Sequence, residues 1–244
     1  MMEIKISSEK SLKGYTLIEG FPGTGLVGPM AASYIIEKLG MEMVGYIYSD
    51  RFPPIAAVHG GVPMHTARLY ADPKSKLVVV FSEFMIPVDA IYQLSDELIS
   101  FVRKNGISRI ISIGGMPSQN PSSAAYVISS QPGVVGKGGK QGLKPVNEGV
   151  IAGVSAMLMS SAVELGIQAV DLLVEVNPEV MDPHYAEVAI KGLGALTGIE
   201  IDTKELEEEA KEVDTKVRDM LKKAKESHDH YAKSAQEFGP PSYA

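Results

Sequence analysis

The residue pattern that points most directly to a chemical function is a group of three glycines near the N-terminus. Gly23, Gly25 and Gly28 form a Gly-x-Gly-x-x-Gly pattern between an expected strand and an expected helix. In that context the backbone N–H groups at a helix N-terminus bind the phosphates of a nucleotide. Asp50 ends the next expected strand, where an acid that binds a ribose hydroxyl belongs.

A tight strand-to-helix turn needs the same small residues, so the glycine pattern has two interpretations. Pro22 directly precedes the first glycine, which is awkward for a dinucleotide-binding turn. No Lys-Ser/Thr pair follows, so the segment is not a P-loop. The sequence predicts either a structural turn or a nucleotide or phosphate site at Gly23 to Gly28.

A second candidate binding group lies at the end of the chain, in Ser242, Tyr243 and Ala244. Gly239 and the two prolines after it cannot continue a helix, so they form a stiff, extended spacer. An aromatic ring and a free carboxylate on such a spacer suit a partner's pocket that supplies a cation or backbone donors. The other interpretation is a frayed end that contains a tyrosine.

The histidines show no arrangement typical of an enzyme or a metal site. His228 and His230 lie two apart on an expected helix and point to different faces. His59 and His65 flank an expected hairpin, which favours a hydrogen-bonded structural role. Asp182-Pro183-His184 looks catalytic, but Asp before Pro is also a good helix N-cap. We expect no catalytic residue, metal or cofactor, and hence no enzyme.

The composition of the 244-residue chain restricts its partners and location. A net charge of −7 gives no general attraction to nucleic acid or anionic lipid. The chain has no cysteine, which excludes disulfides, iron–sulfur clusters and thiolate zinc sites. The N-terminus lacks the apolar core of a signal peptide, and the longest apolar stretch, 150–163, is too short to span a bilayer. We expect a cytoplasmic protein without nucleic-acid or membrane partners.

The elements that must position these residues alternate between strand and helix patterns. Strands are expected at 15–19, 43–48, 55–59, 65–70, 77–81, 109–113 and 170–175. Helices are expected at 30–39, 87–104, 149–165 and 183–196. The continuous apolar runs at 77–81 and 109–113 are typical of strands buried on both faces. The pattern predicts a three-layer α/β/α fold with a largely parallel or mixed sheet.

We expect three regions along the chain: an α/β globular domain at 1–202, a long charged helix at 203–235 and a flexible tail at 236–244. The helix has acid-first pairs four residues apart, such as Glu207–Lys211, and an apolar stripe that contains several alanines. This stripe is too thin for a strong free coiled coil. The helix is therefore expected to pack against the body or a sister subunit, or simply to support the tail.

Five blocks of the chain resemble a known family, the proteasome assembly chaperone 2 family in its archaeal branch. The segment Gly20-Phe21-Pro22-Gly23-Thr24-Gly25-Leu26-Val27-Gly28 is similar to the family's opening signature. The other blocks, in the expected order, are 109–115, 149–154, 172–175 and Asp182-Pro183. One block alone is weak, whereas the ordered set is fairly specific.

The resemblance implies a fold similar to nucleoside phosphorylases, a homo-oligomer, and an ATP-independent chaperone for the α-subunits of the 20S proteasome. Members often end in a hydrophobic residue, a tyrosine and any residue. This motif docks between neighbouring α-subunits, where the carboxylate meets a pocket lysine. Tyr243 and Ala244 match its last two positions, whereas Ser242 departs from the hydrophobic first position.

Two alternatives to the chaperone hypothesis stay open. One is a nucleotide- or phosphate-binding protein or enzyme that uses Gly23 to Gly28 and Asp50. The other is a scaffold whose tail binds a partner other than the proteasome.

Overall fold

A nine-stranded sheet forms the middle of the computed structural model, which describes residues 2–6, 11–131, 142–178 and 180–206. The strands of this sheet are β1 (Met2–Ile6), β2 (Thr16–Gly20), β3 (Glu42–Ser49), β6 (Ala67–Asp72), β7 (Leu77–Ser82), β8 (Arg109–Pro117), β9 (Ala125–Ser129), β10 (Lys144–Pro145) and β11 (Gln168–Val176). The helices are α1 (Val27–Lys38), α2 (Ile91–Lys104), α4 (Gly153–Leu165) and α5 (Pro183–Thr197), with short 3-10 turns η1 (Thr24–Leu26) and η2 (Val88–Ala90).

The sheet is mixed, with a parallel centre and antiparallel pairs on either side. Its order is β1-β3-β6-β7-β2-β8-β11-β9-β10. The four central strands, β7, β2, β8 and β11, are parallel to one another. All the residues of β2 and β7 are buried, as their apolar runs predict for strands covered on both faces.

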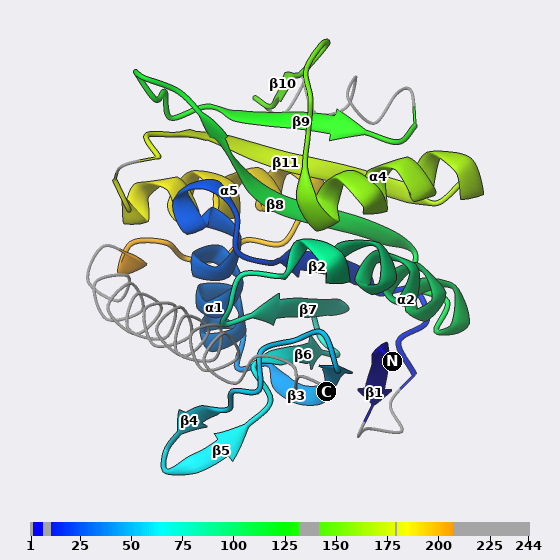
Figure 1. The fold of residues 1–244 in the computed structure, drawn as a ribbon. Helices are drawn as coiled ribbons and strands as arrows, with labels where there is room; N and C mark the ends of the chain where they lie inside the picture. The colour runs from blue at the N-terminus through cyan, green and yellow to red at the C-terminus, as the bar shows by residue number, and fades with distance from the viewer. Residues whose placement is uncertain (1, 7–10, 132–141, 179, 207–244) are drawn as a thin grey trace, which may run out of the picture.

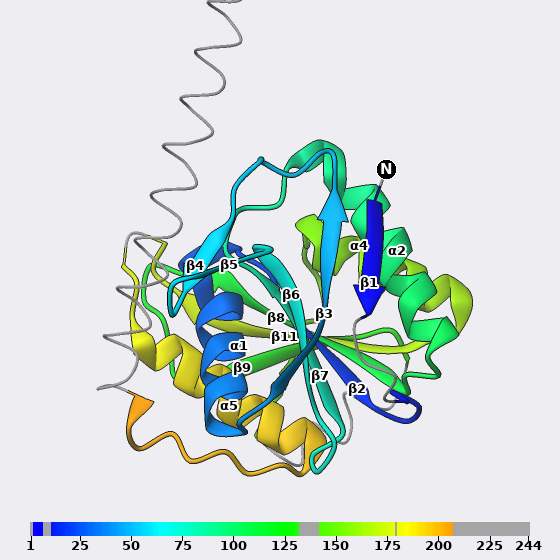
Figure 2. The same cartoon turned by 90° about the horizontal axis from the view of Figure 1, so that it is seen from below.

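The helices form one layer on each face of the sheet, which confirms the expected three-layer α/β/α fold. Figure 2 shows α1 and α5 on one side of the sheet and α2 and α4 on the other. Side chains alternate between the two apolar cores along each central strand. In β2, Leu17 packs into the core under α2 and α4, and Ile18 into the core under α1 and α5.

Helix α5 begins and ends at residues suited to those positions. Asp182 is its N-cap, and the side chain accepts a hydrogen bond of 2.9 Å from the backbone N–H of His184. Pro183 occupies the first turn, where its missing N–H costs nothing. Gly198 ends the helix at φ 76°, a left-handed conformation that favours glycine. The N-cap interpretation of Asp182 is thus confirmed.

The hairpin around Gly60 and Gly61 differs from the expected one. β4 (Ala57–His59) pairs across this turn with β5 (Val62–Met64), and the hairpin projects from the body (Figure 1). The expected strand at 65–70 is instead β6, which joins the main sheet between β3 and β7. The physical reason is that its alternate residues, Ala67, Leu69 and Ala71, are buried in the main core.

The last described segment of the chain lies on α1. The Tyr34 hydroxyl donates a hydrogen bond of 2.7 Å to the carbonyl oxygen of Asp202. Lys38 pairs with Glu205 at 2.7 Å between Nζ and Oε2, and Leu206 is buried. Apart from these first residues, the expected helix at 203–235 and the tail at 236–244 lie outside the described residues.

Candidate functional site

The candidate site lies at the carboxyl ends of the four parallel strands, where open α/β sheets usually bind ligands. The glycine loop is at this edge, because it runs from Gly20, the last residue of β2, through η1 to the start of α1. Gly114 and Gly115 lie in the last part of the neighbouring strand β8. The strand and helix expected on either side of the loop are both present.

The glycines of the loop allow a close approach between backbones. A Cβ atom on Gly28 would lie 2.7 Å from the carbonyl oxygen of Phe21 and 2.8 Å from that of Ile113. A Cβ atom on Gly115 would collide with the carbonyl oxygen of Thr24. Real side chains do not tolerate such contacts, so the loop packs directly on β8 only because these positions lack a side chain.

The other two glycines of the motif differ from each other. Gly25 has φ 68°, and a Cβ atom there would lie 3.0 Å from the side chain of Val176 at the end of β11. Gly23 has an extended backbone, and no atom lies within 4 Å of the place where its Cβ would be. Packing therefore explains Gly25 and Gly28, and it leaves Gly23 unexplained.

Asp50 lies apart from the loop. It follows β3, and the strands β6 and β7 separate β3 from β2. At the usual spacing of about 4.8 Å between strands, this is about 14 Å. In dinucleotide-binding folds the two corresponding strands are adjacent. The structure thus does not bring Asp50 and the glycine loop together in the dinucleotide-binding arrangement.

Two buried carboxyl groups lie behind the glycine loop, on the face of the sheet covered by α2 and α4. Glu19 of β2 and Asp171 of β11 are both paired in register with Ser112 of β8, which lies between them. The three residues are 3%, 1% and 1% exposed. The Phe21 N–H donates to Oε1 of Glu19 at 2.8 Å. The other carboxyl oxygens and the serine hydroxyl lack hydrogen-bond partners among the described residues.

Burial changes the acidity of both carboxyl groups. Removal from water raises the pKa of Glu19 to about 7, and the Phe21 N–H offsets part of this effect. Burial and the nearby Glu19 raise the pKa of Asp171 to about 7. The folded protein therefore favours the protonated form of these groups well above the pH at which they ionise in the unfolded chain.

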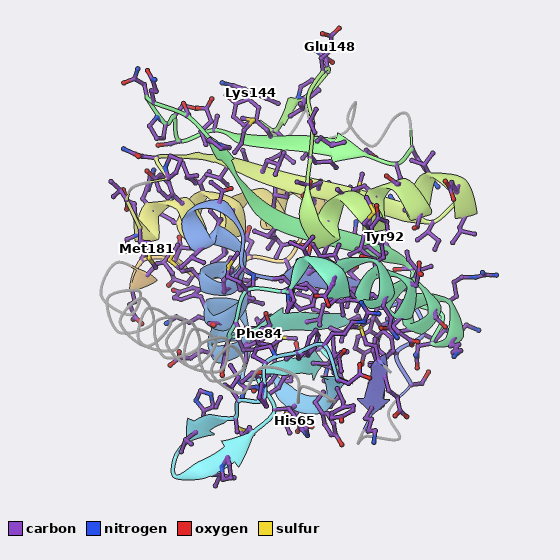
Figure 3. All side chains as sticks on the ribbon, viewed as in Figure 1. His65, Phe84, Tyr92, Lys144, Glu148 and Met181 are labelled. Carbon is purple, nitrogen blue, oxygen red and sulfur yellow. The ribbon has the colours of Figure 1, made fainter. Side chains whose placement is uncertain are left out.

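The β4–β5 hairpin contacts a buried ion pair of the body through His59. Arg68 of β6 and Glu83, which follows β7, are both buried and are hydrogen-bonded to each other. His59 of the hairpin places Nε2 2.7 Å from Oε1 of Glu83, so the hydrogen-bonded role expected for His59 is confirmed. His65 stacks on Tyr46 of β3 with 3.9 Å between ring centroids, and Figure 3 labels His65 in the lower part of the view.

The two buried acids were not predicted as site residues, although the sequence carries a weak sign of them. Glu19 and Asp171 interrupt apolar strand patterns, which is unusual in strands buried on both faces.

Among the described residues no group of three or more His, Cys, Asp or Glu side chains could hold a metal ion. No helix in the described ranges has the length and apolarity needed to cross a bilayer. Ser242, Tyr243 and Ala244 lie outside the described residues.

A comparison with models of known families identifies the family of the chain. The model of the PAC2 family matches residues 17–221, which include the glycine loop and every helix described above. The chain belongs to the PAC2 family. This confirms the family resemblance read from the sequence.

Two solved structures resemble this chain in fold, and a curated human protein resembles part of its sequence. The crystal structure of Pyrococcus furiosus PbaA, described as an archaeal homolog of proteasome-assembly chaperone, superposes with a TM-score of 0.82 at 23% identity, covering 93% of this chain and all of that one. P. furiosus PbaB, an archaeal proteasome activator, has a TM-score of 0.75 at 21% identity, covering 89% and 98%. Human proteasome assembly chaperone 2 is 29% identical over 115 residues, 43% of this chain and 42% of that one.

Substitution of the loop glycines separates packing from ligand binding. We expect Gly28→Ala to destabilise the protein by about 2 kcal/mol, because two backbone carbonyls must move away from the new methyl group. Gly23→Ala is the matched control and should change the free energy of unfolding by less than about 0.5 kcal/mol. Denaturant unfolding of both variants measures this difference. Equal stability of Gly28→Ala and the wild type would contradict the packing explanation.

The buried carboxyl groups make stability depend on pH. Their pKa values are raised in the folded state, so their contribution to stability is present when they are protonated and is lost as the pH rises through about 7. We expect the melting temperature to fall between about pH 4, near the unfolded pKa values, and about pH 7, where the folded groups ionise. In Asp171→Asn this fall should be roughly halved, because one of the two ionisations is removed. An equal fall in the variant and the wild type would contradict the assignment.

Proposed function

We propose that the protein is an ATP-independent, chaperone-like protein that binds the α-subunits of the 20S proteasome and assists its assembly. Its membership of the PAC2 family is the observation that carries this proposal. A relative named as a proteasome assembly chaperone and a fold shared with PbaA add support. The proposal makes the surface of the molecule and its C-terminal segment, and not an internal cavity, the functional parts.

The contact with the α-subunits is assigned to Tyr243 and the carboxylate of Ala244. The ring would fill a pocket between neighbouring subunits, and the carboxylate would pair with a lysine there. Ser242 stands where a hydrophobic residue would add contact area. Each tail therefore binds weakly, and several tails on one oligomer bind together through their effective concentration.

The geometry of the glycine loop supports a function without nucleotide. Gly25 and Gly28 are needed to seat the loop on β8 and β11. The N-cap of α1 is Leu26, which has a left-handed φ of 53° and no side-chain cap. Asp50 is three strands away from β2. None of these features requires a bound phosphate, so the nucleotide-binding alternative gains no support from them.

Self-association is assigned to an apolar surface at the start of α2. Met85, Val88 and Tyr92 lie between the end of β7 and the first turn of α2, and they are 58%, 82% and 72% exposed. Tyr92 is labelled on α2 in Figure 3. Large apolar side chains this exposed in one short segment are typical of a surface that another protein covers. A second copy of the chain is the proposed partner.

Changes in the tail test the contact with the proteasome. Tyr243→Ala should weaken binding to isolated α-rings by about 30-fold or more, because loss of an anchoring aromatic ring costs about 2 kcal/mol or more. Ser242→Leu should strengthen binding, because it restores a hydrophobic residue at that position. Surface plasmon resonance with immobilised α-rings gives both affinities.

Two further measurements make the tail experiment decisive. Addition of two glycines after Ala244 should weaken binding as much as Tyr243→Ala, because it moves the carboxylate out of the pocket. Equal binding by the wild type and Tyr243→Ala would remove the tail from the mechanism. Binding that is lost in Tyr243→Ala but kept after the glycine extension would assign the contact to the ring alone.

A charge on the apolar surface tests self-association. Val88→Asp should lower the mass of the assembly measured by light scattering, because a carboxylate would have to be buried in the interface. Val163→Asp is the matched control, since Val163 is also exposed but lies near the end of α4. Equal masses for Val88→Asp and the wild type would place the interface elsewhere.

A further inference from the structure

A serine, a histidine and a glutamate form a hydrogen-bonded row at the edge of the sheet that also carries the glycine loop. The Ser123 hydroxyl lies 2.8 Å from Nε2 of His184. On the other side of the ring, Nδ1 of His184 lies 3.0 Å from Oε2 of Glu187. This is the order of groups found in serine hydrolases: a hydroxyl, a base and an acid that orients the base.

Two separate segments bring this row together. Ser123 lies in the connection from β8 to β9, which is tied to β11 by a hydrogen bond of 2.9 Å from Ser118 N–H to the Val176 carbonyl. His184 lies in the first turn of α5, whose start is fixed by the Asp182 cap, and Glu187 follows three residues later on the same helix. Figure 3 labels Met181 in the segment that leads into this helix. The ring of His184 is therefore held from both sides.

Hydrogen bonding selects the tautomer of the neutral histidine ring. Hydrogen bonds from Lys191 and then from His184 lower the pKa of Glu187, so its side chain is a carboxylate at neutral pH. A carboxylate only accepts hydrogen bonds, so Nδ1 of His184 carries the proton that faces it. In the neutral ring Nε2 is then left as an acceptor for the Ser123 hydroxyl.

The neighbouring serine provides a contrast within the same loop. Ser122 is also exposed, but its hydroxyl donates to Oε2 of Glu175 at 2.6 Å, and its backbone N–H binds the same oxygen at 2.9 Å. A carboxylate whose pKa is lowered by these hydrogen bonds is a weak base. Only Ser123 faces an imidazole, so the two adjacent serines should differ in reactivity.

We propose that Ser123 is an activated nucleophile that accepts acyl groups from small reactive esters, with His184 as general base and Glu187 as a positioning residue. Oγ of Ser123 bonds to the carbonyl carbon while its proton moves to Nε2 of His184. The bond from carbon to the ester oxygen then breaks, and the alcohol leaves with the proton from His184. Water then attacks the carbonyl carbon of the acyl-serine, and its proton moves to Nε2 of His184. The bond from carbon to Oγ breaks, the acid leaves, and Oγ of Ser123 takes the proton back from His184.

Release of the acyl group should be slow. Helix N-termini often supply the N–H groups that stabilise an oxyanion. In α5 the first such group, on His184, is already bound to the Asp182 side chain, and that of Tyr185 is bound to the Asp182 carbonyl. Acylation and hydrolysis both lack this stabilisation, so only a reactive ester acylates Ser123 and the acyl-serine is hydrolysed slowly.

A fluorophosphonate reagent tests the proposal on the intact chain, because it reacts with activated serines by loss of fluoride. Peptide mass spectrometry should find the adduct on Ser123, and Ser123→Ala should remove it. Ser122→Ala, the matched control, should keep the labelling rate within about twofold. His184→Gln should lower the rate by about 100-fold or more, the usual contribution of a general base.

The pH dependence of labelling distinguishes a base from a merely structural histidine. The rate should rise with pH as the imidazole loses its proton. In Glu187→Gln the labelling rate should fall, because the amide no longer selects the tautomer in which Nε2 accepts the Ser123 proton. An adduct on another residue, an unchanged rate in His184→Gln, or no adduct on protein with the wild-type melting temperature would each overturn the proposal.

Discussion

The direct contact between the loop after β2 and the strand β8 is the constraint on which the rest of this edge of the molecule depends. Gly28 and Gly115 allow backbone atoms to meet where any side chain would prevent it. The contact lies at the start of α1, at the edge of the sheet where many α/β proteins hold a ligand. Packing thus explains two glycines, Gly25 and Gly28, of a motif that in other proteins often binds a nucleotide.

Much of the fold could be predicted because its central strands are buried on both faces. Continuous apolar runs gave the positions of β7 and β8, and glycines or prolines marked the ends of the helices. The outer strands β1, β9 and β10 were missed, because partly exposed or very short strands have no such run. β6 was paired with the wrong strand, since a hairpin and a strand in the main sheet have similar local patterns.

The candidate sites were less predictable than the fold, because they depend on contacts between distant segments. The glycine spacing drew attention to the correct loop, but only the contact with Ile113 and Val176 shows what two of those glycines do. Ser123 and His184 are 61 residues apart, and nothing in the sequence indicates that they meet. The tail residues could be singled out from sequence alone, since their chemistry is local.

The attachment of the last described segment to α1 has a mechanical consequence. Tyr34 and Lys38 hold Asp202 and Glu205, and Leu206 is buried beside them. Tension applied to the chain beyond Leu206 would therefore load these contacts before it reached the end of α5. A partner that pulled on this end would have to break them before it could unwind α5.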